Sequence, residues 1–416
     1  MAEFVIHGQK PLKGEIEVFG AKNAAIKMIA ASILINGLVK LSNVPQISDI
    51  EKLCLILEKM GAKTKQVDHN LEIDCTHLNN TNPDPFLVRQ IRASVVLVGP
   101  ILARFGRVFI PHPGGDKIGS RPIDRHLKVF RDLGVEVTEE NKGYTFRVGE
   151  SSNNHASFDN ITVTGTENIL LFACTLDRET KISNCAIEPE IIDLIDFLNK
   201  AGAKIEVQNR EIIIKKNNEL SSVEYTVLPD RIEAGTFAIL AAAAQSPLKI
   251  LKCNPEHLQK FLSKLKEIGV KFDVGKDFIY IRESSNLKAT DIETEEYPGF
   301  ATDLQPPIGL LLTQVQGVSR LKENLFENRL GYLEELKTMG AQIEIINHRE
   351  AVITGPCSLH GGEIQSLDIR AGVTLIIAGL IAKGVTTIRE AENIDRGYEK
   401  IEQRLTTVGA DIKRIQ

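Results

Sequence analysis

The sequence predicts an α/β fold built from six repeats of about 70 residues, and two periodic patterns support this prediction. In the first pattern an amphipathic helix ends at a glycine, alanine or valine follows, and a short alternating strand begins. Successive glycines lie 73, 68, 67, 71 and 69 residues apart, which indicates one supersecondary unit repeated. Glycine just after a helix supplies the left-handed cap that other residues adopt at a cost. The six glycines are Gly61, Gly134, Gly202, Gly269, Gly340 and Gly409.

The second pattern is a more uniformly apolar helix ahead of each amphipathic one, as in 24–35, 93–103 and 371–382. A helix that is apolar on nearly all sides is usually buried. Each nevertheless opens with a polar residue, which taken alone is more often a capping or solvating residue. Helix starts also present N–H groups and partial positive charge that favour anions. Because four of the six starts are basic, we favour a ligand site. The helices begin near Lys22, Arg92, Thr166, Arg231, Asp303 and Arg370.

The first repeat shows the expected order of strand, buried helix, strand, amphipathic helix and hairpin. We expect these elements at 14–19, 22–36, 38–42, 50–60, 63–67 and 71–74. Three repeats form each of two lobes, with the seam at Leu228-Pro229-Asp230. We expect strands in 1–21 to pair with the C-terminal lobe, which makes two crossings and permits hinge closure. The expected lobes are 22–229, carrying a mobile loop at 111–122, and 230–416 together with 1–21.

Composition restricts the class of protein. The 416 residues carry a net charge of −5, no tryptophan and 5% aromatics, which argues against nucleic acid as a partner. No signal-peptide pattern opens the chain, and no apolar run approaches the ~18 residues that span a bilayer. None of the six cysteines forms a CxxC pair. We therefore expect a cytoplasmic protein, a monomer, with reduced thiols, no metal, no cofactor and no membrane partner.

The segment from Pro111 to Asp124 is the richest loop, with three glycines and three prolines close together. It also carries Asp116, Lys117 and Arg121. Such a composition fits an active-site lid that carries acids and bases, and it equally fits a plain surface loop.

Seven motifs stand in order along the whole chain. They are Gly20-Ala21-Lys22-Asn23-Ala24-Ala25, Ile91-Arg92-Ala93-Ser94, the Pro-Gly-Gly loop ending Arg121-Pro122-Ile123-Asp124, Leu228-Pro229-Asp230-Arg231-Ile232-Glu233, Thr302-Asp303, Phe326-Glu327-Asn328-Arg329 and Asp395-Arg396-Gly397-Tyr398. By these motifs the chain resembles the UDP-N-acetylglucosamine 1-carboxyvinyltransferases of the enolpyruvyl transferase family. The resemblance implies a two-lobed inside-out α/β barrel of six βαβαββ units, with three buried parallel helices in each lobe and the site between lobes.

The implied reaction moves the enolpyruvyl group of phosphoenolpyruvate to the 3-hydroxyl of UDP-N-acetylglucosamine and releases phosphate, as the first committed step of peptidoglycan synthesis. Phosphoenolpyruvate carries a phosphate and a carboxylate, so its pocket needs fixed cations. Arginine binds planar oxyanions through paired bonds, and lysine acts as a compact charge. The residues that the resemblance implies for this ligand are Lys22, Asn23, Arg121, Arg329, Arg370 and Arg396.

The sugar hydroxyl loses its proton as it attacks, and the resemblance implies Asp303 as the general base. The alternative role for Asp303 is a helix cap. Pro306 and Pro307 follow closely, so we expect an irregular helix start. The stretch Thr162-Val163-Thr164-Gly165 departs from the family's usual Ser-Val-Gly-Ala. The residues implied for the UDP-sugar are Arg92, Arg121, Pro122, Ile123, Asp124, Arg125, Thr162, Val163, Asp303 and Leu325.

Asp116 stands where most of the family carries cysteine as the acid that protonates the methylene carbon, and a minority carries aspartate. We expect Asp116 to be the general acid, with its pKa raised by burial on lid closure or by nearby phosphate. Because a carboxylate is a poorer nucleophile than a thiolate, we expect the epoxide fosfomycin not to inactivate this protein. Together with Lys22, Asp303 and Arg396, Asp116 completes the implied catalytic set.

Two other functions remain open at this point. The shikimate-pathway enolpyruvyl transferases share the donor and the repeats, but they carry Ser-Lys-Ser where this chain has Ala21-Lys22-Asn23. A non-catalytic UDP-sugar-binding paralogue is the alternative of a different class, with Asp116 as the sign of lost chemistry.

Overall fold

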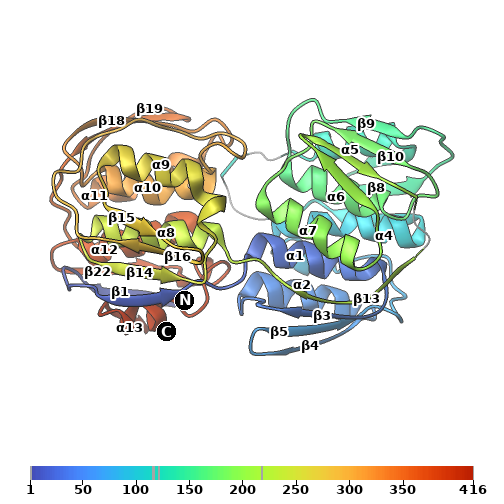
Figure 1. The fold of residues 1–416 in the computed structure, drawn as a ribbon, viewed down its shortest axis with the longest axis horizontal. Helices are drawn as coiled ribbons and strands as arrows, with labels where there is room; N and C mark the ends of the chain where they lie inside the picture. The colour runs from blue at the N-terminus through green and yellow to red at the C-terminus, as the bar shows by residue number, and fades with distance from the viewer. Residues whose placement is uncertain (1, 115–117, 120–121, 217–218, 416) are drawn as a thin grey trace. The chain divides into compact units, whose positions relative to one another are not determined.

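The six predicted repeats are present in the structure, a computed structural model that describes residues 2–114, 118–119, 122–216 and 219–415 (Figure 1). All six repeat glycines have positive φ, from 90° at Gly134 to 117° at Gly202. At Gly269 the backbone N–H bonds back to the Leu265 carbonyl at 3.1 Å, which closes the last helical turn. The glycine pattern is thereby confirmed as a set of left-handed helix caps.

The first repeat follows the expected order. Its elements are β2 (Gly14–Glu17), α1 (Lys22–Ala31), η1 (Ser32–Leu34), β3 (Ile35–Ser42), α2 (Ser48–Lys59), β4 (Lys63–Val67) and β5 (Asn70–Asp74). The buried helix α1 is shorter than predicted and ends in the 3₁₀ turn η1. Ser32 Oγ donates to the Ile29 carbonyl at 2.6 Å, which competes with helix continuation.

The third repeat follows the same order, whereas in the second the short helix α3 (Pro85–Val88) precedes the buried helix and no strand among the described residues opens the repeat. Their other elements are η2 (Arg92–Leu97), α4 (Val98–Phe105), β6 (Arg107–Pro111), α5 (Asp124–Asp132), β7 (Val135–Glu140), β8 (Gly143–Val148), β9 (His155–Ser157), α6 (Val163–Ala173), β10 (Thr180–Ser183), α7 (Pro189–Lys200), β11 (Ile205–Gln208) and β12 (Glu211–Ile214).

The last three repeats complete the chain, and the sixth borrows β1 (Glu3–His7) from the N-terminus. Their elements are β13 (Leu220–Thr226), α8 (Arg231–Ala243), β14 (Leu248–Leu251), η3 (Pro255–Leu258), α9 (Gln259–Ile268), β15 (Phe272–Val274), β16 (Phe278–Ile281), β17 (Ile292–Glu293), η4 (Thr302–Leu304), α10 (Gln305–Leu312), β18 (Gly317–Lys322), η5 (Arg329–Gly331), α11 (Tyr332–Thr338), β19 (Gln342–Asn347), β20 (Glu350–Gly355), β21 (Glu363–Gln365), α12 (Ile369–Ile381), β22 (Val385–Arg389), η6 (Ala391–Asn393), α13 (Ile401–Thr407) and β23 (Asp411–Ile415).

The chain forms two compact units, and the first, called the N-terminal unit, holds the described residues of Gly20–Gly115 and Pro122–Leu228. Its described strands form sheets ordered β13-β3-β5-β4, β11-β12-β10-β9 and β6-β8-β7. Helices α1, α4 and α6 lie inside these sheets, and their apolar residues form one core. The amphipathic helices α2, α5 and α7 complete the three repeats, as Figure 1 shows in blue to green.

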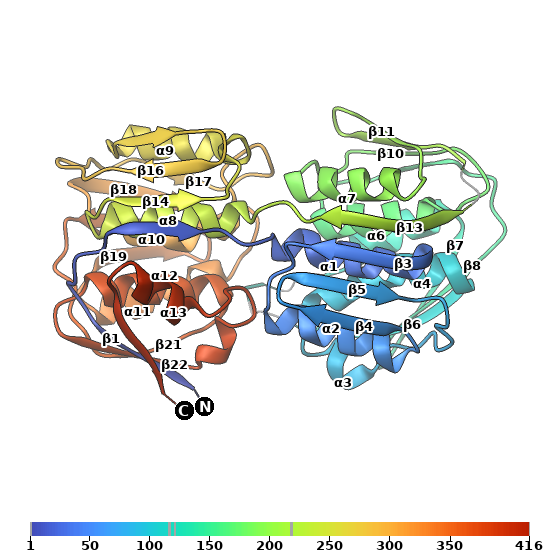
Figure 2. The same ribbon diagram turned by 60° about the horizontal axis from the view of Figure 1, so that its bottom comes forward.

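The C-terminal unit holds the described residues of Met1–Phe19, Asp116–Arg121 and Pro229–Gln416. Its described strands form sheets ordered β21-β22-β1-β23, β15-β16-β14-β2 and β17-β18-β20-β19 around α8, α10 and α12 (Figure 2). Strand β1 pairs with β22 and β23, and β2 pairs with β14. These pairings confirm that the first strands join the C-terminal sheets, and Figure 1 shows β1 in blue beside β22.

Candidate active site

The predicted site residues fall on both compact units, apart from Asp116 and Arg121, which lie outside the described residues. The C-terminal unit carries Asp303, Leu325, Arg329, Arg370 and Arg396. The N-terminal unit carries the remaining ones, from Lys22 to Val163.

Asp303 lies between two buried arginines in the C-terminal unit. Its Oδ1 accepts from Arg329 Nη2 at 2.8 Å, and its Oδ2 accepts from Arg370 Nε at 3.1 Å and Nη2 at 3.0 Å. The Asp303 side chain is 26% exposed, whereas those of Arg329 and Arg370 are 3% and 5% exposed. Two guanidinium groups at these distances stabilise the carboxylate form of Asp303. The structure thus brings together two residues from separate motifs, Asp303 and Arg329, and one predicted helix start, Arg370.

Arg370 is held in place by a second set of contacts. Its Nη1 donates to the Tyr398 hydroxyl at 3.1 Å, and that hydroxyl lies 3.0 Å from Thr236 Oγ1. Burial alone would lower the pKa of Arg370, but the charges of Asp303, Tyr398 and Asp230 raise this pKa above its ordinary value. Arg370 therefore stays charged at the start of α12.

Asp303 does not act as a helix cap here. The turn η4 has no side-chain capping bond, and the following helix α10 starts with prolines in its first turn. This geometry confirms the irregular start expected from Pro306 and Pro307. The neighbouring Thr302 is fixed by the fully buried Glu323, which accepts from Thr302 Oγ1 at 2.9 Å.

Glu323 also positions the segment that carries Leu325. Its Oε1 accepts from Thr294 Oγ1 at 3.0 Å and from the backbone N–H groups of Leu325 and Phe326 at 2.9 and 3.1 Å. One buried carboxylate thus ties the start of η4 to the segment before Arg329. Nothing in the sequence marked Glu323, because a glutamate at the end of a strand is normally solvated.

Arg396 lies on a turn that is fixed on both sides. Asp395 accepts from both Nη atoms of Arg414 at 2.6 Å, and Tyr398 is buried against Arg370 and Thr236. Arg396 itself is half-buried. Tyr398 stood inside a quoted motif but had no assigned role, and its contact with Arg370 supplies one.

In the N-terminal unit Lys22 begins α1, and its Nζ lies 3.3 Å from Oδ2 of the buried Asp49 on α2. Asn23 follows on the first turn, where its carbonyl accepts from Lys27 Nζ at 3.0 Å. Neither Asp49 nor Lys27 was identified from the sequence. The apolar pattern of α1 concealed Lys27.

Of the residues predicted for the nucleotide, Arg125 lies next to the segment of Thr162 and Val163, whereas Asp303 and Leu325 belong to the C-terminal unit. Arg125 on α5 donates from Nη1 to the Ile161 carbonyl at 3.2 Å, next to Thr162 and Val163. Thr162 caps α6 by accepting from the Gly165 N–H at 3.3 Å, so α6 begins at Val163, three residues before the expected Thr166. Arg92 donates to the Pro113 carbonyl at 3.4 Å, at the base of the glycine-rich loop.

The helix starts divide into capped and uncapped ones. Asp230 and Asp368 cap α8 and α12 by accepting from two backbone N–H groups each, so Arg231 and Arg370 follow ordinary caps. Lys22, Arg92 and Asp303 instead lie at starts where no side chain caps the helix. Capping thus accounts for the starts of α8 and α12, while ligand binding at the helix starts stays a prediction.

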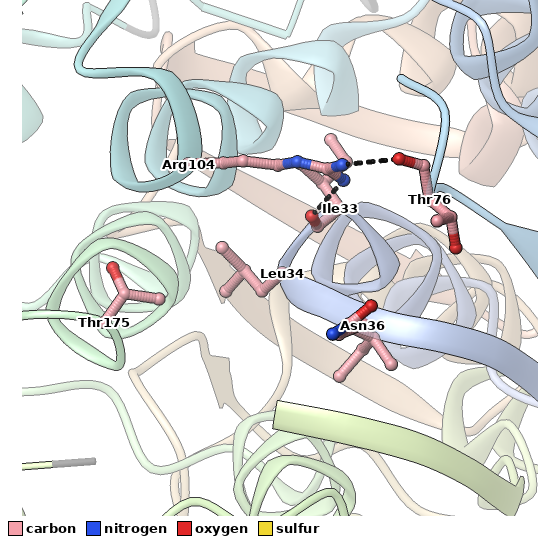
Figure 3. A pocket seen from close by; sticks show the side chains of 7 residues that line it. Ile33, Leu34, Asn36, Thr76, Arg104 and Thr175 are labelled. Atoms are coloured by element: carbon pink, nitrogen blue, oxygen red, sulfur yellow. Dashed lines mark hydrogen bonds between the residues drawn. The ribbon is translucent and has the colours of Figure 1, made fainter. Parts of the chain in front are cut away.

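Two hollows lie near these elements. One of about 130 Å³ in the C-terminal unit is lined by Arg231, Tyr297, Ala301 and Leu304 among others, and so adjoins the turn that carries Asp303. Another of about 260 Å³ lies at the end of α1 remote from Lys22, where Arg104 donates to the carbonyls of Ile33 and Thr76 (Figure 3). Arg104 also donates to the Cys75 carbonyl at 2.8 Å. It contains no predicted site residue.

Three further observations concern the described part of the chain. It contains no helix long and apolar enough to cross a membrane, and no group of three or more His, Cys, Asp or Glu residues placed to hold a metal ion. All six cysteines are free thiols, and five are buried. Burial raises the pKa of Cys174 and Cys185 to about 12.

Comparison with known proteins gives matches along the whole chain. The sequence profile of the family described as EPSP synthase (3-phosphoshikimate 1-carboxyvinyltransferase) matches residues 6–405. A UDP-N-acetylglucosamine 1-carboxyvinyltransferase 2 from Caldanaerobacter subterraneus subsp. tengcongensis is 43% identical and covers 100% of both chains. One from Koribacter versatilis is 42% identical, over 100% of this chain and 97% of the relative.

Solved structures show the same fold. The enolpyruvyl transferase NikO from Streptomyces tendae superposes with a TM-score of 0.90 at 23% identity, over 99% of this chain and 98% of the other. EPSP synthase from Acinetobacter baumannii gives 0.75 at 18% identity, over 100% of both chains. The fold is therefore the predicted enolpyruvyl transferase fold. The chain belongs to the enolpyruvyl transferase family, and its full-length relatives there carry the name UDP-N-acetylglucosamine 1-carboxyvinyltransferase.

Proposed function

We propose that this protein transfers the enolpyruvyl group of phosphoenolpyruvate to the 3-hydroxyl of UDP-N-acetylglucosamine, with release of phosphate. The observation that carries the proposal is the identity of 40–43%, over the full chain, to relatives named for this activity. The shikimate-pathway activity has less support, because the EPSP synthase structures share only the fold at 17–18% identity. The product would enter cell-wall synthesis in the cytoplasm.

The proposed chemistry is an addition followed by an elimination. The sugar 3-oxygen bonds to C2 of phosphoenolpyruvate while its proton passes to a base, and the methylene carbon C3 gains a proton from an acid. C3 then loses a proton as the C2–O bond to phosphate breaks. Atoms balance without a cofactor, since phosphate leaves with the electron pair of that bond.

We assign the cations to the donor. Lys22, Arg121, Arg329, Arg370 and Arg396, with Asn23, would bind the phosphate and carboxylate of phosphoenolpyruvate. Lys22 and Arg396 belong to different compact units. We propose that these units correspond to the expected lobes 22–229 and 230–416 with 1–21, and that both lobes supply residues for the reaction.

Asp303 would accept the hydroxyl proton. Its two arginine partners oppose this role while both are bound, because they favour the carboxylate over the protonated acid. An anionic substrate that engages Arg329 or Arg370 would draw a guanidinium away and increase the basicity of Asp303. Substrate binding would thus prepare the base.

Asp116 would serve as the acid toward C3. The UDP-sugar would contact residues 122–125, Thr162, Val163, Arg92, Arg121 and Leu325. The bond from Arg125 to the Ile161 carbonyl supports this assignment for residues 122–125, Thr162 and Val163, because it joins α5 to the start of α6.

A phosphate-release assay with different acceptors tests the proposed function. Phosphoenolpyruvate with UDP-N-acetylglucosamine should release phosphate continuously, while shikimate 3-phosphate or no acceptor should give background release. Release only with shikimate 3-phosphate would assign the other activity. Tight binding of the UDP-sugar without release would indicate a non-catalytic paralogue.

A further inference from the structure

A buried ion pair lies beneath the first turn of α1. Lys27 Nζ is 3.3 Å from Glu167 Oε2 on α6, and the two side chains are 7% and 0% exposed. Both residues lie on helices whose buried side chains are mostly apolar, although α6 also buries Thr166 and Asn168. Burying two charges is costly and often gives no net stability, so a pair kept in such a place invites a role other than stability.

Lys27 connects this pair to the proposed donor site. Its Nζ also donates to the Asn23 carbonyl at 3.0 Å. The start of α1 has no side-chain cap and no acidic residue in its first turn, unlike α8 and α12 with their aspartate caps. The Lys22–Asn23 turn is therefore held by the ion pair of Lys22 with Asp49 on α2 and, within α1, by the bond from Lys27 to the Asn23 carbonyl.

Glu167 balances the charge of Lys27, and two further glutamates lie near this pair. Within the described residues, neither Glu167 oxygen has a hydrogen-bond partner, so Lys27 is its main compensation. Glu188 and Glu190, at the start of α7, act on Glu167 as like charges. From α5, the buried His126 reaches Asn168 at 3.3 Å, and burial, with Arg92 of η2 and Arg125, lowers the pKa of His126 to about 3. His126 is thus neutral, and Lys27 is the cation paired with Glu167.

We propose that Glu167 and Lys27 are positioning residues for phosphoenolpyruvate. Ionised Glu167 keeps the Lys27 ammonium on the Asn23 carbonyl, and this contact fixes the turn that presents Lys22 and Asn23. Protonation of Glu167 leaves the buried ammonium unbalanced, so Lys27 withdraws toward water and the turn loosens. The inference rests on the proposed function, since it concerns how the same site binds its donor.

Titration would make this device sensitive near neutral pH. Burial raises the pKa of Glu167 to about 7, with Lys27 opposing the rise and Glu188 and Glu190 adding to it. Affinity for phosphoenolpyruvate should therefore fall as pH drops through 7. The second ionisation of a phosphate near pH 6 also produces an acid limb, but every variant shares that limb. The difference between variants isolates Glu167.

Steady-state phosphate release between pH 5.5 and 9 tests the inference with wild type and Glu167→Gln. At pH 8 the variant should raise KM for phosphoenolpyruvate about tenfold, because the turn that binds this substrate loses an orienting contact. Its KM for UDP-N-acetylglucosamine should stay within about twofold of the wild-type value. It should also lack the part of the acid limb near pH 7. Glu211→Gln breaks the half-exposed Lys181–Glu211 pair of the same unit and should change neither constant.

A double variant, Lys27→Met with Glu167→Met, keeps the volume and removes both charges, so it should fold even if the single variant does not. It should show the same selective rise in KM, with no limb near pH 7. Wild-type KM and pH profile in either folded variant would overturn the inference while leaving the function intact. A wild-type protein without turnover would overturn both.

Discussion

Asp116 is the residue on which the proposed chemistry depends most. A positioned acid accelerates proton transfer by about 10²–10⁴-fold, so Asp116→Asn should reduce kcat by about that factor. The amide matches the carboxylate in size, and the fold should be unaffected. Stopped assays of phosphate release measure the change, and circular dichroism checks the fold. Near-normal turnover in Asp116→Asn would remove Asp116 from the mechanism.

The same position should decide the response to an epoxide. Wild type incubated with fosfomycin should keep its activity and its mass, because a carboxylate is a weak nucleophile and five of the six thiols are buried. Asp116→Cys should gain a covalent adduct on the loop peptide and lose activity. A stoichiometric adduct on wild type, seen by mass spectrometry, would show that some other group reacts.

The sequence predicted the charged residues of the proposed site more readily than the buried residues that hold them in position. Asp303 and Arg329 stood in motifs and Arg370 at a predicted helix start, and the structure joins them directly. Glu323, Asp49 and Glu167 could not be found in this way, because each is a carboxylate whose role arises from burial beside a distant segment. Burial of a single polar residue in an apolar helix leaves only a one-position break in the hydrophobic pattern.

At the scale of the element, we predict that the helix-capping positions require glycine because of their positive φ. Gly269 has φ +97°, and an added Cβ would meet nothing closer than 3.8 Å. Gly269→Ala should therefore lower the free energy of unfolding by about 1–2 kcal/mol through backbone strain alone. Gly362→Ala, at an open position without positive φ, should change it by less than about 1 kcal/mol. Urea unfolding compares the two, and equal effects would contradict the cap assignment.

The helices α1 and α6 should also carry a pH-dependent term in stability. The ordinary pKa of Glu167, 4.5, is raised to about 7 by burial, so the folded state keeps a proton that the unfolded chain loses in between. Stability relative to Glu167→Gln should fall by about 3 kcal/mol as pH rises from 4.5 to 7, and then stay constant. Urea unfolding at several pH values measures this difference. A difference that does not vary with pH would mean that Glu167 titrates alike in both states.

The ends of helices and strands were predictable where a glycine or a change of hydrophobic period marks them. They were less predictable where tertiary contacts determine the end. Strand β4 (Lys63–Val67) matches its prediction. Helix α1 was expected to run to residue 36 but ends at Ala31, because the apolar run continues through η1 into β3 without a period to separate them.

For the whole molecule, the central point is that two hydrophobic cores belong to two compact units, and each unit carries part of the proposed site. The repeats predict two lobes of three copies each, because three copies close one set of sheets. The strands β2 and β13 explain the two crossings: β2 pairs with β14 of the C-terminal unit, and β13 pairs with β3 of the N-terminal unit. The acceptor substrate, by contrast, is inferred from the motifs and the relatives, because the repeat pattern does not indicate it.

The most direct test of that claim is the identity of the product. Purified protein, phosphoenolpyruvate and UDP-N-acetylglucosamine are incubated together, and the nucleotide sugar is recovered and examined by mass spectrometry and carbon NMR. We predict one carboxyvinyl group in ether linkage at the 3-oxygen of the sugar. Recovery of unmodified UDP-N-acetylglucosamine from an enzyme that modifies shikimate 3-phosphate, or that modifies neither acceptor, would contradict the account.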